Sequence, residues 1–206
     1  MTPRQLSREL RTARTPALAK RRAIVGLSLA SAGIMGFLAL YQFGVVRHLP
    51  DARRGRWDAE RVDSSDEAYS LLWTGDAFIG ATSYVATATL AAMGESDRPR
   101  TKPWLSVATS IKVLLDALVA AGLTWTQWSR HRAFCWYCLL ASALTFATVP
   151  LTWGETRAAV KALRRRGLTN DIDYSPGPVD LSALLGSGRA RGRLARGRTR
   201  ATTSPP

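Results

Sequence analysis

Two cysteines, Cys135 and Cys138, are the residues of this 206-residue chain best suited to chemistry, and they lie three positions apart at the start of an apolar run. On a helix this spacing places both thiols on one face. A disulfide between them would need modest local adjustment, because the spacing alone does not guarantee its geometry. The pair can therefore be a redox couple, half of a metal site, or two small apolar residues in a packed helix.

The residues before the pair favour the redox interpretation. Arg130, His131 and Arg132 precede Cys135, and the first turn of a helix stabilises negative charge. Both effects favour a thiolate, which is the form of cysteine that attacks disulfides and quinones. A metal site would need two further ligands. The chain offers only His48 and His131 for this purpose, without a familiar spacing, so no metal is expected.

Four long stretches of the chain carry almost no charge, and each is expected to form a helix that crosses a membrane. A spanning helix needs roughly 20 apolar residues to cross about 30 Å of hydrocarbon, and runs of this length satisfy their backbone in lipid as helices. The predicted spans cover about 23–46, 74–93, 104–125 and 133–153. The expected fold class is an all-α integral membrane four-helix bundle, in a multi-pass protein of the cell membrane.

Lysine and arginine are distributed unevenly between the two sides of this predicted bundle. The N-terminal segment, the second loop and the C-terminal segment together hold 21 of them, against seven in the first and third loops. Because positively charged segments remain on the cytoplasmic side, both termini are expected to be cytoplasmic. The fourth span then begins at the outer face with Cys135 and Cys138, where disulfide chemistry is permitted.

The chain is expected to divide into a basic cytoplasmic N-terminal segment (1–22), a membrane domain (23–153) and a basic, largely disordered cytoplasmic tail (154–206). From 167 onward the tail mixes Gly, Pro, Ser and Arg without apolar periodicity. The net charge of +14 is typical of nucleic-acid binders, but attraction to anionic lipid accounts for the basic ends. The lipid bilayer is the expected partner, and no nucleic acid is expected.

The order and spacing of these features resemble the vitamin K epoxide reductase family over about residues 23–153. Members of that family have four helices, an outward-facing loop after the first, and a Cys-x-x-Cys at the start of the fourth. In the second helix they typically carry Asn-Ser-x-x-Gly and a tyrosine four residues after the glycine. Here Asp76, Gly80 and Tyr84 stand at the corresponding positions of that motif.

The resemblance implies a membrane thiol-disulfide oxidoreductase, which couples Cys135 and Cys138 to a lipophilic quinone (menaquinone or ubiquinone) in a bacterial plasma membrane. Such an enzyme would support disulfide formation outside the cytoplasm, with a thioredoxin-like extracytoplasmic protein as its thiol partner. Asp76, Gly80 and Tyr84 would bind the quinone. The resemblance also implies that Cys138 attacks the quinone and Cys135 resolves the adduct, whereas the helix-start argument favours a thiolate on Cys135. This assignment stays open.

The chain departs from the family in three places. The first outer loop, 47–73, has no cysteine, where the family has a second pair that shuttles electrons from the partner. Asp76 replaces the family's asparagine, and it could donate a hydrogen bond to a quinone only when protonated. Ser142 stands where some members have a tyrosine. The missing loop cysteines support an alternative function, a non-catalytic membrane scaffold or quinone-binding protein on the same fold.

Two further local patterns lead to structural expectations. Residues 64–67 of the first outer loop, Ser-Ser-Asp-Glu, fit a capping box and predict a short helix over the outer mouth of the bundle. Lys112 and Asp116 lie one turn apart near the middle of the third span, where isolated charges are costly. We expect them to pair inside the bundle, and the alternative is a proton route to a reduced quinone.

Overall fold

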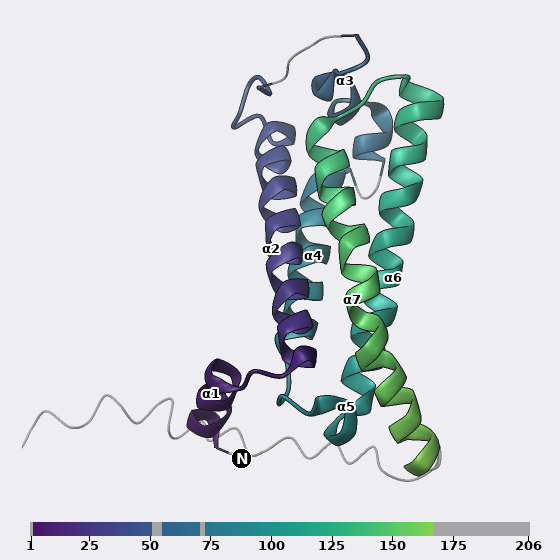
Figure 1. The fold of residues 1–206 in the computed structure, drawn as a ribbon. Helices are drawn as coiled ribbons and strands as arrows, with labels where there is room; N and C mark the ends of the chain where they lie inside the picture. Colours follow the sequence, from purple (N-terminus) through teal and green to yellow (C-terminus); the bar gives the residue numbers. More distant parts are fainter. Residues whose placement is uncertain (1, 51–54, 71–72, 167–206) are drawn as a thin grey trace, which may run out of the picture. The chain divides into compact units, whose positions relative to one another are not determined.

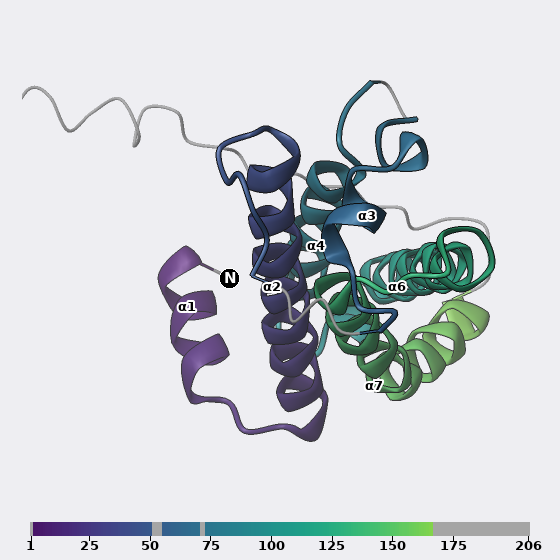
Figure 2. The ribbon, with the colours of Figure 1, turned by 90° about the horizontal axis from the view of Figure 1, so that it is seen from above.

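The computed structural model describes residues 2–50, 55–70 and 73–166. In this part of the chain four long helices pack side by side (Figure 1). Figure 2 shows them from above: α2 packs against both α4 and α7, and α6 packs against α7 and α4. These helices are α2 (Pro16–Gln42), α4 (Asp76–Ala92), α6 (Pro103–Thr126) and α7 (Trp136–Arg166). The described residues contain no strand, so the predicted all-α class is confirmed for them.

Three of the helical segments are long and apolar enough to cross a membrane: Pro16–Gln42, Pro103–His131 and Trp136–Arg165. The fourth predicted span corresponds to α4, which has 17 residues. At 1.5 Å per residue α4 is about 26 Å long, and its residue count lies at the lower end of the range for a span. The protein is therefore a membrane protein by its helices, and the fourth crossing and the orientation stay predictions.

The boundaries of the first helix differ from the expected 23–46. Helix α2 begins at Pro16, because the hydroxyl of Thr15 accepts the backbone N–H of Leu18 at 3.2 Å and proline is well suited to the first helical position. The helix ends at Gln42, and Gly44 follows with φ of +76°, a conformation that glycine adopts without strain. The helix is therefore shifted toward the N-terminus.

Helical residues also lie outside the predicted membrane domain, toward both ends of the sequence. Helix α1 (Pro3–Thr12) lies within the basic N-terminal segment, and α7 continues through residues 154–166 of the expected tail. The rest of the tail, from 167 onward, lies outside the described residues. Helix α5 (Arg98–Thr101) lies at the same end of the bundle as α1 (Figure 1).

Residues 55–70 cover the opposite end of the bundle, and we call them the cap segment. They contain α3 (Ala59–Asp63) and a 3-10 turn, η1 (Asp66–Tyr69). The predicted capping box is wrong. Asp58 caps α3 by accepting the backbone N–H of Arg61 at 3.0 Å. Ser64, the capping residue of the predicted box, instead donates its hydroxyl to the carbonyl of Glu60 at 2.6 Å, and η1 has no side-chain cap. The short helix expected after residues 64–67 is present in part as the 3-10 turn η1, and α3 precedes it.

The cap segment is tied to the start of α7 by backbone hydrogen bonds. The N–H of Phe134 donates to the carbonyl of Arg56 at 2.7 Å, and the N–H of Asp58 donates to the carbonyl of Phe134 at 3.1 Å. The rings of Trp57 and Phe134 pack with their centroids 5.8 Å apart. Because these contacts lie one residue before Cys135, they fix the position of α3 against the cysteine pair.

Two ion pairs connect the helices away from the cap segment. Near its middle, Lys112 Nζ lies 2.5 Å from Asp116 Oδ1 and also donates to the hydroxyl of Ser83 on α4 at 2.7 Å. The expected pairing is therefore confirmed. At the end near α5, Arg98 is fully buried and forms a hydrogen-bonded ion pair with Glu155 of α7.

Candidate functional site

Cys135 occupies the N-cap position of α7, one residue before the helix begins at Trp136. Its carbonyl accepts the backbone N–H of Leu139 at 3.0 Å, and its sulfur accepts the backbone N–H of Cys138 at 3.3 Å. This is the hydrogen bond that an N-cap side chain makes with the third helical residue. The unpaired N–H groups of the helix start favour negative charge there. The structure thus places Cys135 one residue before the first turn of α7, where the N–H groups of the helix start still favour negative charge on its sulfur.

The backbone before Cys135 is shaped to place it there. The end of α6 widens into a π-helical turn over Gln127–His131, a feature often found at functional sites. Arg132 then reverses the chain with a φ of 49°. The side-chain oxygen of Gln127 accepts the backbone N–H of Cys135 at 3.0 Å. Cys135 is consequently fixed from α6 and from α7, and its side chain is fully buried.

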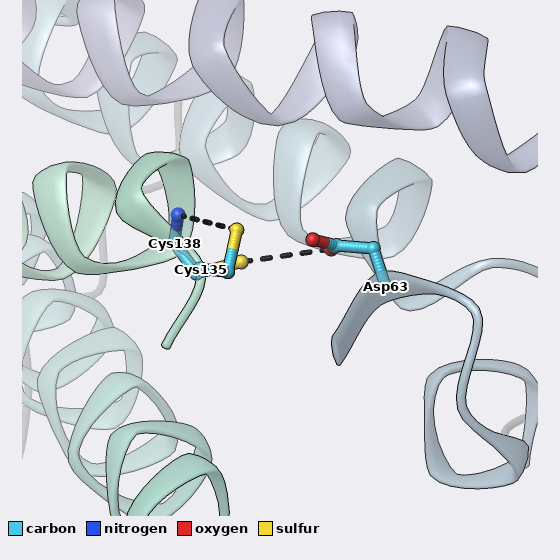
Figure 3. Close-up of side chains that lie close together, drawn as sticks. All are labelled: Asp63, Cys135 and Cys138. Carbon is cyan, nitrogen blue, oxygen red and sulfur yellow. Dashed lines mark hydrogen bonds between the residues drawn. The ribbon is translucent and has the colours of Figure 1, made fainter. Parts of the chain in front are cut away.

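Cys138 lies one turn into α7 and is half-buried. Its thiol donates to Oδ1 of Asp63 over 3.6 Å. Figure 3 shows the two sulfurs and the Asp63 carboxylate facing one another, with α3 of the cap segment supplying the acid. The ligand atoms of these three residues all lie within 4.8 Å of one another. The cysteines are free thiols, so the site joins a dithiol to a buried carboxylate.

Asp63 is the functional-site residue that the sequence analysis missed. Its side chain is 2% exposed, and Oδ2 has no hydrogen-bond partner among the described residues. Burial raises the pKa of Asp63 from 3.8 to about 6; hydrogen bonds from both thiols oppose this increase and the nearby Asp76 adds to it. A signal was present in the sequence: Ala59, Val62 and Asp63 form one buried helical face, which gives an acid an apolar position.

Two thiols and a carboxylate are also donors that zinc accepts, but a structural zinc site has four protein ligands. Neither histidine considered from the sequence joins the group. His48 faces Glu60 at 3.4 Å and His131 faces Glu67 at 3.9 Å. The expectation of no metal stays a prediction, and the geometry is that of a thiol site.

The three predicted quinone-binding residues lie along α4, in different surroundings. Asp76 begins the helix, and its Oδ1 accepts the side-chain N–H of Gln42 at 2.7 Å. A Cβ on Gly80 would lie 3.1 Å from Met35 Cε, so Gly80 permits close packing of α2 on α4. Tyr84 is half-buried and, like Cys138, packs against the apolar cluster that contains Cys135. Tyr84 is thus the predicted residue that shares a cluster with the thiols, and all three assignments stay predictions.

An apolar groove of about 460 Å³ lies along α6 and α7, beside the start of α7. Its lining residues are Ala121, Thr124, Trp125, Trp128, Phe134 and Phe146. Phe134 is the neighbour of Cys135, but neither thiol and none of the predicted quinone-binding residues lines the groove. The groove therefore does not identify a quinone position next to Cys138.

Comparison with known proteins places the chain in a family. A family model described as "Vitamin K epoxide reductase family" matches residues 22–153, more than half of the chain. The match covers most of α2, all of α4 and α6, α7 up to Trp153, and both cysteines. No match was found among the curated proteins or among the solved structures. The matched region agrees with the limits of about 23–153 that the sequence resemblance predicted. The chain belongs to the vitamin K epoxide reductase family of membrane oxidoreductases.

Proposed function

We propose that this protein is a quinone-dependent membrane thiol-disulfide oxidoreductase, in which Cys135 and Cys138 cycle between dithiol and disulfide. The observation that carries the proposal is the geometry of the pair: the sulfur of Cys135 accepts the backbone N–H of Cys138 at 3.3 Å, at the start of α7. This contact brings the two residues together and stabilises a thiolate on Cys135. Family membership supports oxidoreductase chemistry at this site.

The two cysteines have different surroundings, which supports a division of labour. Cys135 is fully buried beneath the cap segment, whereas Cys138 is half-buried and packs on the same cluster as Tyr84. Cys138 is therefore the better placed to meet a quinone in the bundle, and Cys135, with its helix N–H contact, is suited to act second. This order agrees with the assignment that the family resemblance implies.

The proposed reaction transfers two electrons and two protons. The Cys138 thiolate adds to a ring carbon of the quinone, forming a carbon–sulfur bond. The Cys135 thiolate then attacks the sulfur of Cys138, which forms the disulfide and breaks the carbon–sulfur bond. The ring departs with the electron pair as quinol. A thiol partner restores the dithiol by exchange and is itself oxidised to a disulfide.

The electron donor must reach the pair directly, because residues 47–73 contain no cysteine to relay electrons. Cys135 is 0% exposed under the cap segment. A thioredoxin-like extracytoplasmic partner would therefore need the cap segment to move aside, whereas a small thiol needs only a narrow opening. The partner would gain a disulfide, which is the proposed link to disulfide formation outside the cytoplasm.

The proposed topology has four crossings, with both termini in the cytoplasm of a bacterial cell. The cysteine pair and the cap segment lie at one end of the bundle, and the basic α1 and α5 lie at the other (Figure 1). This separation supports an outer location for the thiols. Helix α4 is the fourth crossing in this topology, and its 17 residues are the shortest length that spans the hydrocarbon core.

The test of the function is thiol-dependent reduction of a menaquinone or ubiquinone analogue in membranes that contain the protein. We expect Cys138→Ala and Cys135→Ala each to reduce the rate to the background of membranes without the protein. Ser142→Ala is the matched control, because Ser142 is a buried α7 residue one turn beyond Cys138. Full activity in the Cys138→Ala variant would exclude the proposed mechanism.

The absence of loop cysteines favours one other function, a non-catalytic scaffold or quinone-binding protein. The two functions differ in the redox state of the pair. Alkylation of the protein in cells, with and without prior reduction, measures this state. A pair that stays fully reduced under oxidising conditions outside the cytoplasm would support the scaffold, and a reducible disulfide would support the oxidoreductase.

A further inference from the structure

Asp63 presents a buried carboxylate to the thiol pair, and no cation pairs with it among the residues that the structure describes. The thiol of Cys138 contacts Oδ1, and Oδ2 is buried with no partner among the described residues. Removing a carboxylate from water without pairing it is costly, and most buried polar groups in proteins find a partner. A buried carboxylate with one oxygen on a thiol and the other oxygen without a partner among the described residues is therefore suited to change its protonation state during the reaction.

The titratable groups that face Asp63 come from each neighbouring element. Tyr41 lies on α2, Glu60 on α3 and Tyr69 on η1, and all three are electrostatic neighbours within this end of the bundle. Asp76 lies on α4, where Gln42 holds its carboxylate. Helix α7 contributes the two thiols. None of these groups is a cation, so within the part of the chain that the structure describes the thiol protons are the positive charge that can move to Asp63.

The two sulfurs differ in how each can lose its proton. Cys135 accepts the backbone N–H of Cys138, so the start of the helix supports its thiolate. Cys138 has instead a contact with a carboxylate oxygen, which would repel a thiolate unless the proton moved to the acid. The arrangement is that of a thiol and its general base.

We propose that Asp63 is the proton-transfer group of the cysteine pair, accepting the proton of Cys138 and delivering it toward the quinone. This inference rests on the proposed function and adds a catalytic residue that lies outside the Cys-x-x-Cys motif. It also explains why a buried acid occupies the face of α3 that covers the thiols.

The proton inventory of the reaction balances with one carboxyl. Asp63 takes the Cys138 proton as the thiolate adds to the quinone, and it gives this proton to the ring oxygen that gains charge. The carboxylate then takes the Cys135 proton as that sulfur attacks Cys138. The departing ring receives this second proton. Two protons and two electrons leave the thiols, and the quinol holds both.

The carboxyl can accept a proton only when it is ionised. The pKa of Asp63 is about 6, so we expect the single-turnover rate of quinol formation to rise with pH through about 6 and to fall below it. An asparagine has no such titration. The variant Asp63→Asn should lose this part of the pH profile, a change that a purely structural substitution would not produce.

The experiment measures single-turnover quinol formation by the pre-reduced, detergent-solubilised protein between pH 5 and 8. We expect Asp63→Asn to lower the maximal rate on the order of 100-fold, the usual size of a lost general base, with little change in the quinone concentration that gives half of the maximal rate. Asp63→Glu should restore at least roughly tenfold over Asp63→Asn and retain the dependence on pH near 6. Asp66→Asn, which removes an exposed acid of the cap segment, should match the wild type.

Each result has one meaning. A wild-type protein that forms no quinol excludes the proposed function itself, whatever Asp63 does. If the wild type is active, a rate for Asp63→Asn within roughly threefold of it, or a profile that still rises through pH 6, overturns the inference. So does an Asp63→Glu variant no faster than Asp63→Asn. Disulfide formation by a chemical oxidant in each variant confirms that the thiols are intact.

Discussion

Replacing Asp63 with asparagine should stabilise the fold at neutral pH, although it slows the proposed reaction. The folded protein binds the Asp63 proton more tightly than the unfolded chain does, because burial raises its pKa from 3.8 to about 6. Stability from this group therefore falls as the pH rises between these two values and stays at the lower level above them. Asparagine carries no charge at any pH and removes this cost.

The size of the effect follows from the two pKa values. Each pH unit between them corresponds to 1.36 kcal/mol, so the ionised Asp63 costs about 3 kcal/mol at pH 8. At pH 5 the cost is about half of this, because the folded carboxyl is then mostly protonated. The Asp63→Asn variant should thus exceed the wild type in stability by an amount that grows with pH. The amide must place one N–H beside the sulfurs, so 3 kcal/mol is the upper value.

Thermal unfolding of the purified protein in one detergent, at pH 5 and at pH 8, measures this difference. A gain of 3 kcal/mol corresponds to a rise in Tm of roughly 6–12 °C for a chain of this size. Asp66→Asn is the control, because an exposed acid should change stability by less than about 0.5 kcal/mol. An Asp63→Asn variant that is less stable than the wild type at pH 8, or whose advantage shrinks from pH 5 to pH 8, would refute the reasoning.

Two further predictions concern the rest of the bundle. Glu155→Gln should destabilise the protein by about 3–5 kcal/mol, because it leaves the fully buried Arg98 without its carboxylate. The control Asp97→Asn, which removes the exposed partner of Arg100, should cost less than about 1 kcal/mol. Equal losses of stability in the two variants would show that the buried pair stabilises the fold no more than the exposed one. In a variant without the native cysteines, Glu67→Cys should react with an impermeant maleimide on intact cells, and Asp97→Cys should react only after permeabilisation. Labelling of both on intact cells would mean that α4 does not cross the membrane.

The long helices were predictable because their cause is local. A charge-free run of about 20 residues satisfies its backbone in lipid as a helix. All four long helices were therefore recognised, and α4 and α6 match their predicted limits within two residues at both ends. The shift of α2 came from Thr15 and Pro16, whose capping chemistry lies in the sequence but outside the apolar run. The pairing of Lys112 with Asp116 was predictable for the same local reason, since one helical turn separates them.

The missed parts of the site depend on contacts between distant segments. Asp63 reaches Cys138 across 75 positions of the chain, and the position of α3 is set by its backbone pairing with Phe134. The capping-box pattern at 64–67 could not reveal this, because Asp58 forms a competing cap. The apolar face of α3 that contains Asp63 indicated a buried acid. The loop sequence did not indicate that this acid contacts Cys138.

A single turnover of the reduced protein with a quinone analogue, followed by alkylation of the remaining thiols and mass measurement, tests most directly whether the cysteine pair delivers the electrons. We predict that one quinol forms for each protein molecule and that Cys135 and Cys138 both become inaccessible to the alkylating reagent until a reductant is added. Two results would contradict the proposal that this pair delivers the electrons. One is quinol formation after which both cysteines still react with the alkylating reagent, and the other is no quinol at all from fully reduced protein.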